Sequence, residues 1–378
     1  MRIGISTSVI GRGKTGIGQY VFALTRALLA QGGAHRFVLF VLEEDLPLFD
    51  FAKDRVELVP VPEKFRPAVN DIRWHQTQLP RLAGELRLDV LHVPSYRRML
   101  WRKPCPLVVT IHDLAPFRVA GKYDWMRMFY GRVVARRLAR RQNAIIAISQ
   151  TTARDLQQFF AAPPDRVTVI HNGIEHARFC PGSSEVAKTV IASRFRIYDP
   201  FFLYVARLEH PGKNHVRLIA AFNQFKAATG SDWQLALAGS DWHGAGAIHA
   251  AIKQSPVAGH IHTLGFVGDP DLPILYRAAD AFVFPSLYEG FGLPPIEAMA
   301  CGCPVISSAR GSLGEVVGEA ASIINPEDIS DMAARLQVMA ENLSLRKTWR
   351  AAGLARAKKF DWLQTAKETM EVYERVVG

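Results

Sequence analysis

Two glutamates, Glu289 and Glu297, flank a glycine turn and could accept hydrogen bonds from sugar hydroxyl groups. Between them, Gly290-Phe291-Gly292-Leu293 leads into two prolines that favour the start of a helix. The unpaired N–H groups of such a turn and the positive end of a helix favour an anion such as phosphate. Phosphate between two hydroxyl acceptors predicts a nucleotide-sugar site. The alternative is a strand, loop and helix whose glutamates are solvated or cap the helix.

Two cations follow a short apolar strand in the second half of the chain, in the sequence PFFLYVARLEHPGKN. The guanidinium of Arg207 can donate two parallel hydrogen bonds to phosphate, whereas the ammonium of Lys213 acts as a point charge. Both side chains are therefore predicted to reach one diphosphate, and the alternative is a pair of ordinary surface cations.

Short apolar runs alternate with amphipathic stretches, which predicts parallel sheets covered by helices on both faces. In the first half, strands are expected at 36–42, 56–61, 90–93 and 107–111, with a helix at 19–30. The second half repeats this order. Ligands of such sheets bind beyond the carboxyl ends of the strands. His112 follows the strand PLVVTI at that edge, so it is a candidate ligand contact, with a purely structural histidine as the alternative.

The stretch PSLYEGFGLPPIEAMACGCPVI resembles the paired-glutamate motif of the retaining glycosyltransferases of family 4. Weaker similarity covers nearly the whole chain, in GIGQYVFAL, TIHDLAPF, AISQTTARDL, HNGIEHARF and YVARLEHPGKN. The resemblance implies the GT-B architecture, an α/β fold in which two Rossmann-like parallel-sheet domains face each other across a cleft. It implies a first domain at 1–178 completed by a C-terminal helix at 361–378, a linker at 179–199, and a nucleotide-sugar-binding domain at 200–360.

The same resemblance implies roles for individual residues. Glu289 would hold sugar hydroxyls and orient the developing oxocarbenium, Glu297 would accept from the ribose, and His112 would contact the donor sugar. Arg207 and Lys213 match the cationic pair of the family, although their spacing is one residue longer than in many members. The donor-binding positions that match the family's motifs are Gly16, Gly18, Phe266, Val267, Gly290, Phe291, Gly292, Leu293 and Glu297.

The function implied is retaining transfer of a hexosyl unit from a nucleoside-diphosphate sugar to a lipid-linked or polysaccharide acceptor in cell-surface glycan synthesis. The most similar bacterial enzymes suggest mannose and GDP-mannose, and a UDP-sugar is the alternative donor. An epimerase, a phosphorolytic enzyme or a nicotinamide oxidoreductase is a more remote alternative. No cofactor is expected. Asp269-Pro270-Asp271 fits a DxD metal motif, but it precedes a helix expected at 272–279 and is predicted to cap that helix instead.

Two further motifs lie in the loop after the first strand, where GRGKTG at 11–16 fits the dinucleotide fingerprint GxGxxG. The end of this stretch also imitates a P-loop, but the first glycine of a P-loop would fall on Ser8. The dinucleotide interpretation requires an acid about 20 residues further on, and Glu43 and Glu44 come later than that. On the pattern of the family, this is predicted to be a flexible loop whose backbone approaches the donor diphosphate.

Basic charge is concentrated in the first half, where residues 1–180 hold 27 Lys+Arg against 15 Asp+Glu. The densest stretch, 97–141, interleaves twelve basic side chains with apolar ones such as Trp101, Trp125 and Phe129. This pattern predicts contact with an anionic membrane surface or a lipid-diphosphate acceptor, with a solvated helix face as the alternative. Nucleic acid is not the predicted partner, because the sequence contains no nucleic-acid-binding module.

Length and composition predict a cytoplasmic protein that can lie peripherally on the inner face of the plasma membrane. The 378 residues suffice for two domains, and no apolar run approaches the roughly 18 residues that span a bilayer. The first residues, MRIGISTSV, have the pattern of a strand and lack the layout of a signal peptide. The four cysteines are scattered, and they are predicted to be thiols rather than disulfides or zinc ligands.

Overall fold

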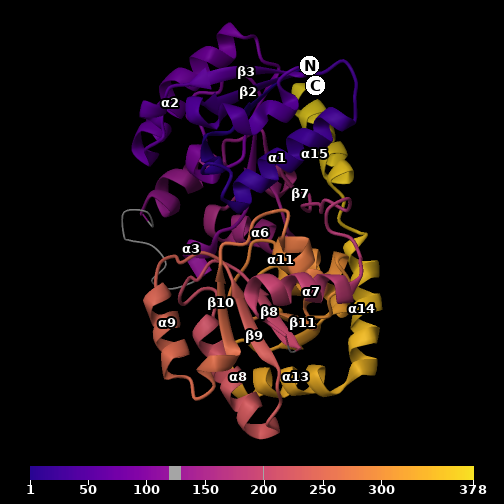
Figure 1. Cartoon of the computed structure of the whole chain (residues 1–378). Helices are drawn as coiled ribbons and strands as arrows, with labels where there is room; N and C mark the ends of the chain where they lie inside the picture. The colour runs from indigo at the N-terminus through magenta and orange to yellow at the C-terminus, as the bar shows by residue number, and fades with distance from the viewer. Residues whose placement is uncertain (119–128, 199) are drawn as a thin grey trace. The chain divides into compact units, whose positions relative to one another are not determined.

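The computed structural model describes residues 1–118, 129–198 and 200–378, which divide into two compact units (Figure 1). The first unit comprises Met1–Gly173 and Asp361–Gly378, and the second comprises Ile174–Phe360. In the described residues, each unit is built on one parallel sheet, of seven strands in the first and six in the second. The prediction of an α/β fold with two parallel-sheet domains is confirmed.

The first sheet has the strand order β3-β2-β1-β4-β5-β6-β7. Its strands are β1 (Arg2–Ser6), β2 (Arg36–Leu42), β3 (Val56–Val61), β4 (Val90–Val93), β5 (Leu107–Ile111), β6 (Ala144–Ala147) and β7 (Val167–Val169). The strands β4, β5 and β6 are buried along their whole length, because helices cover both faces of the sheet. This burial explains why they read as continuous apolar runs rather than as alternating ones.

Helices of the first unit follow nearly every strand. They are α1 (Gly16–Ala30), α2 (Ala68–Glu85), α3 (Ala115–Arg118), α5 (Arg136–Ala139), α6 (Gln150–Asp155) and α15 (Trp362–Val377), with shorter or irregular turns η1 (Ser8–Ile10), η2 (Glu43–Ala52), η3 (Glu63–Phe65), η4 (Tyr96–Arg98), η5 (Tyr130–Ala135), η6 (Leu156–Phe160) and η7 (Pro164–Arg166). The helix α1 begins three residues before the position predicted for it. Thr15 has an extended backbone there, and its hydroxyl accepts a hydrogen bond from the Gly18 N–H at 3.0 Å.

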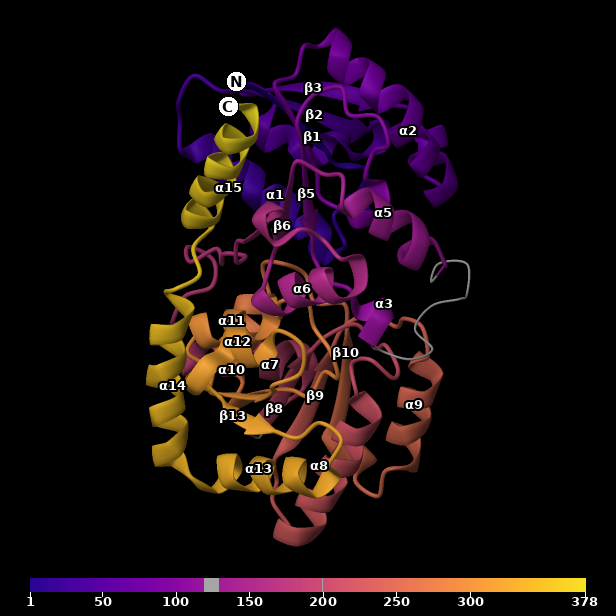
Figure 2. The same ribbon diagram turned by 180° about the vertical axis from the view of Figure 1, so that it is seen from behind.

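The C-terminal helix α15 lies beside α1 in both views (Figures 1 and 2). A buried polar chain connects it to the centre of the sheet. The Tyr373 hydroxyl lies 2.6 Å from His92 Nδ1, and His92 Nε2 lies 2.8 Å from the Thr110 hydroxyl. Tyr20 on α1 completes the chain, with its hydroxyl 3.0 Å from that of Thr110. Burial lowers the pKa of His92 to about 3, so the imidazole is neutral and works as a structural hydrogen-bond partner.

The second sheet has the strand order β10-β9-β8-β11-β12-β13. Its strands are β8 (Phe201–Val205), β9 (Gln234–Ala238), β10 (Ile261–Gly265), β11 (Ala281–Phe284), β12 (Val305–Ser308) and β13 (Ser322–Ile324). Its helices are α7 (Ser184–Phe195), α8 (His215–Thr229), α9 (Ala245–Gln254), α10 (Leu272–Ala278), α11 (Leu293–Ala300), α12 (Leu313–Val317), α13 (Ile329–Glu341) and α14 (Leu343–Ala357), with the short turns η8 (Ala258–His260) and η9 (Gly318–Ala320).

The segment 179–199, expected as a linker, contains α7, and α7 belongs to the second unit. Lys188 on this helix pairs with Asp280 at 2.6 Å, just before β11. The helix also packs against α10. The described residues of this segment, 179–198, are therefore part of a folded layer of the second unit.

Part of the basic stretch at 97–141 lies outside the described residues, including Tyr123, Trp125, Met126 and Met128. In the remainder, the helical segment 129–139 and the turn that follows it expose Phe129, Val133 and several arginines. Among the helices that the structure describes, none combines the length and the apolar character needed to cross a membrane.

Candidate functional site

The residues predicted to bind a nucleotide-sugar gather at one edge of the second sheet. Neighbouring strands β8 and β11 run parallel, so their carboxyl ends meet at that edge. Arg207 and Lys213 follow β8, and the turn from Glu289 to Leu293 follows β11. A backbone hydrogen bond from Leu287 N–H to the Gly212 carbonyl, 3.0 Å long, joins the two loops. The fold thus brings together groups that are 76 residues apart in the chain.

Lys213 and Glu289 form the central contact of this site. The Lys213 ammonium donates to Glu289 Oε1 at 2.6 Å, and the two side chains are only 19% and 16% exposed. The Lys213 carbonyl accepts a hydrogen bond of 2.6 Å from the buried hydroxyl of Tyr204. The cation is thereby fixed at both its backbone and its head group, and two charges with little access to water neutralise each other.

The turn after Glu289 leads into α11, as predicted. Pro294 and Pro295 occupy its first turn and have no N–H to offer. The backbone donors that can meet an anion are therefore those of the turn, Gly290 to Leu293, more than those of the helix itself. This confines the anion-binding part of the motif to its glycine-rich half.

A buried serine that the motifs did not single out holds this turn in place. Ser312 Oγ donates to the carbonyls of Glu289 at 3.0 Å and Phe291 at 2.8 Å, and the Ser312 N–H donates to Glu289 O at 3.0 Å. Gly311, just before it, has φ +64°, and a Cβ there would lie 2.4 Å from Glu289 O. The loop after β12 therefore sets the position of Glu289. The only signal in the sequence was the glycine-rich stretch RGSLG.

Glu297 lies on α11 and is partly buried. The Tyr276 hydroxyl on α10 donates to Glu297 Oε2 at 2.9 Å. Removal of water by the surrounding protein raises the pKa of Glu297 to about 7, against the lowering effects of the Tyr276 hydrogen bond and of Arg178. Near neutral pH this carboxyl group can thus hold a proton or accept from a hydroxyl.

The raised pKa of Glu297 should make the free energy of unfolding depend on pH, and the variant Glu297→Gln tests this. The folded protein holds the Glu297 proton between the ordinary pKa of 4.5 and about 7, whereas the unfolded chain has lost it. The stabilisation that this proton gives is therefore lost as the pH rises through that interval. The free energy of unfolding of the wild type, relative to the glutamine variant, should be lower at pH 8 than at pH 5 in urea titrations. The exposed Glu319→Gln should show no such change.

Arg207 lies over the ring of Trp242, with its guanidinium carbon 4.6 Å from the centroid. Its Nη2 is also 3.4 Å from Glu209 Oε2. About half of the Arg207 side chain, 48%, is exposed. The cation is thus held by an aromatic face and a carboxylate while its remaining edge meets solvent.

Phe266 and Val267 follow β10 at the same edge of the sheet, and Phe266 is 70% exposed. The prediction that the DxD stretch caps α10 is wrong at the side-chain level. Asp271 holds the N-cap position without a capping hydrogen bond, and its carboxylate pairs with Arg194 instead. Among the residues that the structure describes, no three His, Cys, Asp or Glu side chains are grouped so that they could hold a metal ion.

In the first unit, His112 follows β5 at the carboxyl edge of its own sheet. Its ring meets Tyr20 edge-on at 4.7 Å between centroids. Burial lowers the pKa of His112 to about 4, so the ring is neutral at pH 7. Its Nε2 is buried and has no hydrogen-bond partner among the described residues. A buried ring nitrogen without a partner is uncommon, and it marks this histidine as able to bind an added polar group.

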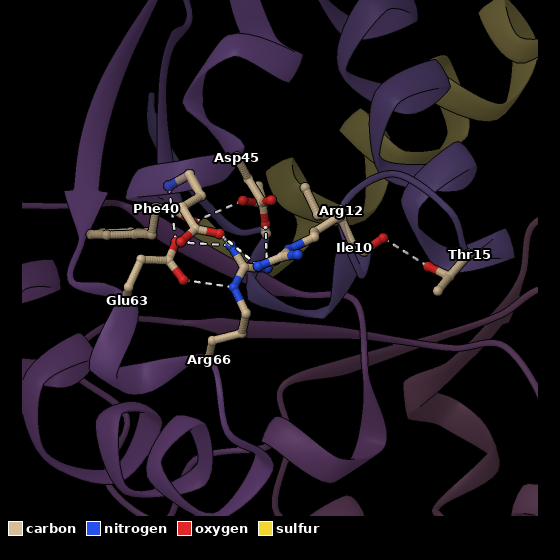
Figure 3. A network of polar contacts seen from close by, with 9 residues as sticks. Ile10, Arg12, Thr15, Phe40, Asp45, Glu63 and Arg66 are labelled. Atoms are coloured by element: carbon tan, nitrogen blue, oxygen red, sulfur yellow. Dashed lines mark hydrogen bonds and ion pairs between the residues drawn. The ribbon is translucent and has the colours of Figure 1, made fainter.

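The glycine loop after β1 is fastened by polar contacts (Figure 3). Thr15 Oγ1 donates to the Ile10 carbonyl at 2.9 Å, and Arg12 pairs with Glu44 at 2.7 Å. Arg66 joins the two turns beyond β2 and β3, by ion pairs to Asp45 at 3.1 Å and Glu63 at 2.6 Å. Glu44, one of the two acids considered for a dinucleotide ribose, thus pairs with the loop itself.

The two glycines in the first turn of α1 that match the family differ in what they require. A Cβ at Gly18 would lie 2.7 Å from the Ile10 carbonyl, so the start of α1 packs too closely for any other residue. A Cβ at Gly16 would meet no atom of the described residues within 4 Å. The absence of a side chain at Gly16 therefore leaves free space at the start of α1, and no close contact with the described residues requires a glycine there.

Comparisons with known proteins agree with this geometry. Two family models match, "Glycosyltransferase Family 4" over residues 14–178 and "Glycosyl transferases group 1" over residues 191–356. The O-antigen chain mannosyltransferase B of Escherichia coli is 31% identical over 71% of this chain and 70% of its own length. The MMP alpha-(1->4)-mannosyltransferase of Mycolicibacterium hassiacum is 28% identical over 72% of this chain and 66% of its own length.

Among solved structures, HepE of Anabaena in complex with UDP-glucose superposes with a TM-score of 0.79 at 20% identity. The match covers 99% of this chain and 100% of HepE. At that identity the likeness concerns the fold, which is that of the GT-B glycosyltransferases. The family models, the identity to O-antigen chain mannosyltransferase B and the fold lead to one conclusion: the chain belongs to the glycosyltransferases of family 4 and is a hexosyltransferase.

Proposed function

We propose that this glycosyltransferase moves mannose from GDP-mannose to a lipid-linked or polysaccharide acceptor, with retention of anomeric configuration, in the synthesis of a cell-surface glycan. The observation that supports this proposal most directly is the Lys213–Glu289 contact of 2.6 Å at the carboxyl edge of the second sheet. The choice of mannose is supported by the names of two relatives, the O-antigen chain mannosyltransferase B at 31% identity and the MMP alpha-(1->4)-mannosyltransferase at 28%. Retention follows from the family's paired-glutamate motif.

In this proposal, the second unit binds the diphosphate and stabilises it as it leaves. Arg207 offers the solvent-facing edge of a guanidinium, and Lys213 offers an ammonium fixed by Tyr204 and Glu289. The N–H groups of the turn Gly290 to Leu293 add neutral donors. Fixed charges and dipoles of this kind stabilise a developing anion without reorganisation, so we propose that the reaction needs no metal.

The two carboxylates bind hydroxyl groups of the donor as hydrogen-bond acceptors. Glu289 accepts hydrogen bonds from hydroxyl groups of the sugar while it stays paired with Lys213. Glu297 accepts hydrogen bonds from the ribose hydroxyl groups. His112, neutral and with a buried Nε2, is proposed to bond a sugar hydroxyl. Phe266 and Val267 are proposed to contact the base. We propose that the leaving phosphate assists deprotonation of the acceptor on the same face of the sugar.

A thermal-shift panel of GDP-mannose, UDP-glucose and an ADP-sugar tests the donor. A ligand that binds only the native state raises the melting temperature, so GDP-mannose should give the largest increase. The UDP-glucose complex of HepE makes a UDP-sugar the second candidate.

In an activity assay with the preferred donor and an acceptor, the rate of turnover should be unchanged by EDTA. Loss of activity in EDTA would contradict metal-free chemistry. Consumption of the donor without any acceptor would argue for an epimerase.

We further propose that the segment 129–141 contacts an anionic membrane where a lipid-linked acceptor resides. Phe129 and Val133 are exposed beside Arg136, Arg137 and Arg140, a mixture that suits an interface with acidic lipids. The triple alanine variant of these arginines should sediment less with phosphatidylglycerol vesicles than the wild type. The matched triple variant of exposed lysines, K347A/K358A/K359A, should sediment as the wild type does. Equal sedimentation of both variants would contradict the proposal.

A further inference from the structure

The loop after β9 runs alongside the loop that carries Arg207, and backbone hydrogen bonds fix the two together. Leu208 N–H donates to the Ser240 carbonyl at 2.9 Å, and Trp242 N–H donates to the Leu208 carbonyl at 3.1 Å. His210 N–H donates to the His243 carbonyl at 3.0 Å. The parallel pairing of β8 with β9 therefore continues past the ends of the strands and into the site.

A glycine makes this close approach possible. At Gly239 a Cβ would lie 1.9 Å from the Ala206 carbonyl, and its φ is +153°. The two backbones are thus pressed together one residue before Arg207. Since the loop from Gly239 to Gly244 cannot slide against the other loop, the position of the Trp242 backbone is set relative to Arg207.

The indole ring of Trp242 contacts the guanidinium of Arg207. Trp242 is 56% exposed, so much of its ring can meet other side chains at the surface. The contact of 4.6 Å with Arg207 is within the range of a cation–π interaction. An arginine that is about half exposed would otherwise lose much rotamer freedom when it binds a ligand. Stacking fixes the plane of the guanidinium and leaves N–H groups at its edge for oxygen acceptors.

We infer that Trp242 is a positioning residue for the donor diphosphate, which it serves through Arg207 without contacting the nucleotide itself. This inference rests on the proposed function, in which Arg207 binds the diphosphate. Tryptophan is the aromatic ring with the strongest cation–π attraction, and phenylalanine retains part of it. An aliphatic residue of similar size keeps the apolar cover but loses the attraction to the cation.

The test is calorimetric binding of GDP and of UDP to the wild type, W242F, W242L, R207A and W242L/R207A. W242L should weaken binding of the preferred nucleotide roughly fivefold, whereas W242F should stay within about twofold of the wild type. R207A should weaken binding at least as much as W242L. In the R207A background, W242L should have no further effect, because the residue on which Trp242 acts is gone. Tyr198→Leu, another exposed aromatic in the second unit, is the control and should bind as the wild type does.

The outcomes separate this inference from the function on which it rests. Wild-type affinity in R207A would refute the assignment of Arg207 to the diphosphate, and the inference with it. Loss of affinity in R207A with wild-type affinity in W242L would overturn the inference about Trp242 alone. A further loss from W242L in the R207A background would also overturn it, since the indole would then bind the nucleotide directly.

Discussion

Replacement of Lys213 by alanine is expected to lower turnover with GDP-mannose and acceptor at least tenfold, or about 1.4 kcal/mol of transition-state stabilisation. The ammonium is held 2.6 Å from Glu289 with little access to solvent, so the variant removes a fixed, poorly hydrated charge from the site. Glu289→Ala should cause a loss of similar size, because it removes the proposed acceptor for sugar hydroxyls. It also leaves the poorly exposed Lys213 without this partner.

A second lysine–carboxylate pair of the same unit provides the control. Lys188 and Asp280 are also 2.6 Å apart, but they lie where β11 begins, at the end of the strand opposite Glu289. K188A should therefore keep near-normal rates in steady-state assays. The losses from K213A and E289A should not add in the double variant, since each removes one half of the same contact. Near-normal rates in both single variants would refute the assigned roles.

Gly311→Ala is expected to abolish most activity while it destabilises the fold only moderately. The residue has φ +64°, and a left-handed backbone costs an L-residue roughly 1–2 kcal/mol. The new methyl group would also lie 2.4 Å from the Glu289 carbonyl and 2.8 Å from its nitrogen. Because real atoms cannot stay so close, the turn that carries Glu289 must move. A displacement of about 1 Å in a catalytic group can cost on the order of a hundredfold in rate.

Gly230→Ala separates the two effects of this substitution. Gly230 ends α8 with φ +61°, but a Cβ there would meet no described atom within 4 Å. Its loss of stability in urea unfolding should resemble the backbone part of the Gly311 effect, with turnover unchanged. If the two variants lost the same activity, displacement of Glu289 would not be the cause.

Elements with a strong local signal were predictable from the sequence. The strands β2, β4 and β11 are apolar runs that end at polar or turn-forming residues, and burial on both faces of a parallel sheet requires such runs. The turn between Glu289 and Glu297 was equally visible, because glycines followed by two prolines permit few backbone conformations. These features depend on residues close together in the chain.

What was missed depends on contacts between distant segments. Ser312, which holds the Glu289 turn, lies in the glycine-rich stretch RGSLG just before α12, and nothing in that stretch points to Glu289. Trp242 and Tyr276 meet Arg207 and Glu297 only after neighbouring strands are paired. The capping role given to Asp271 lost to an ion pair with Arg194, 77 residues away. Spacing within one segment carries no information about such partners.

The first unit is discontinuous: its last piece, Asp361–Gly378, is synthesised only after the whole of the second unit. Until then, His92 Nδ1 lacks the Tyr373 hydroxyl with which it forms a buried hydrogen bond. The nascent N-terminal unit therefore has all the strands of its sheet but lacks its last helix, α15, until the second unit has been synthesised. In this protein, the unit whose synthesis begins first is therefore the last to be completed.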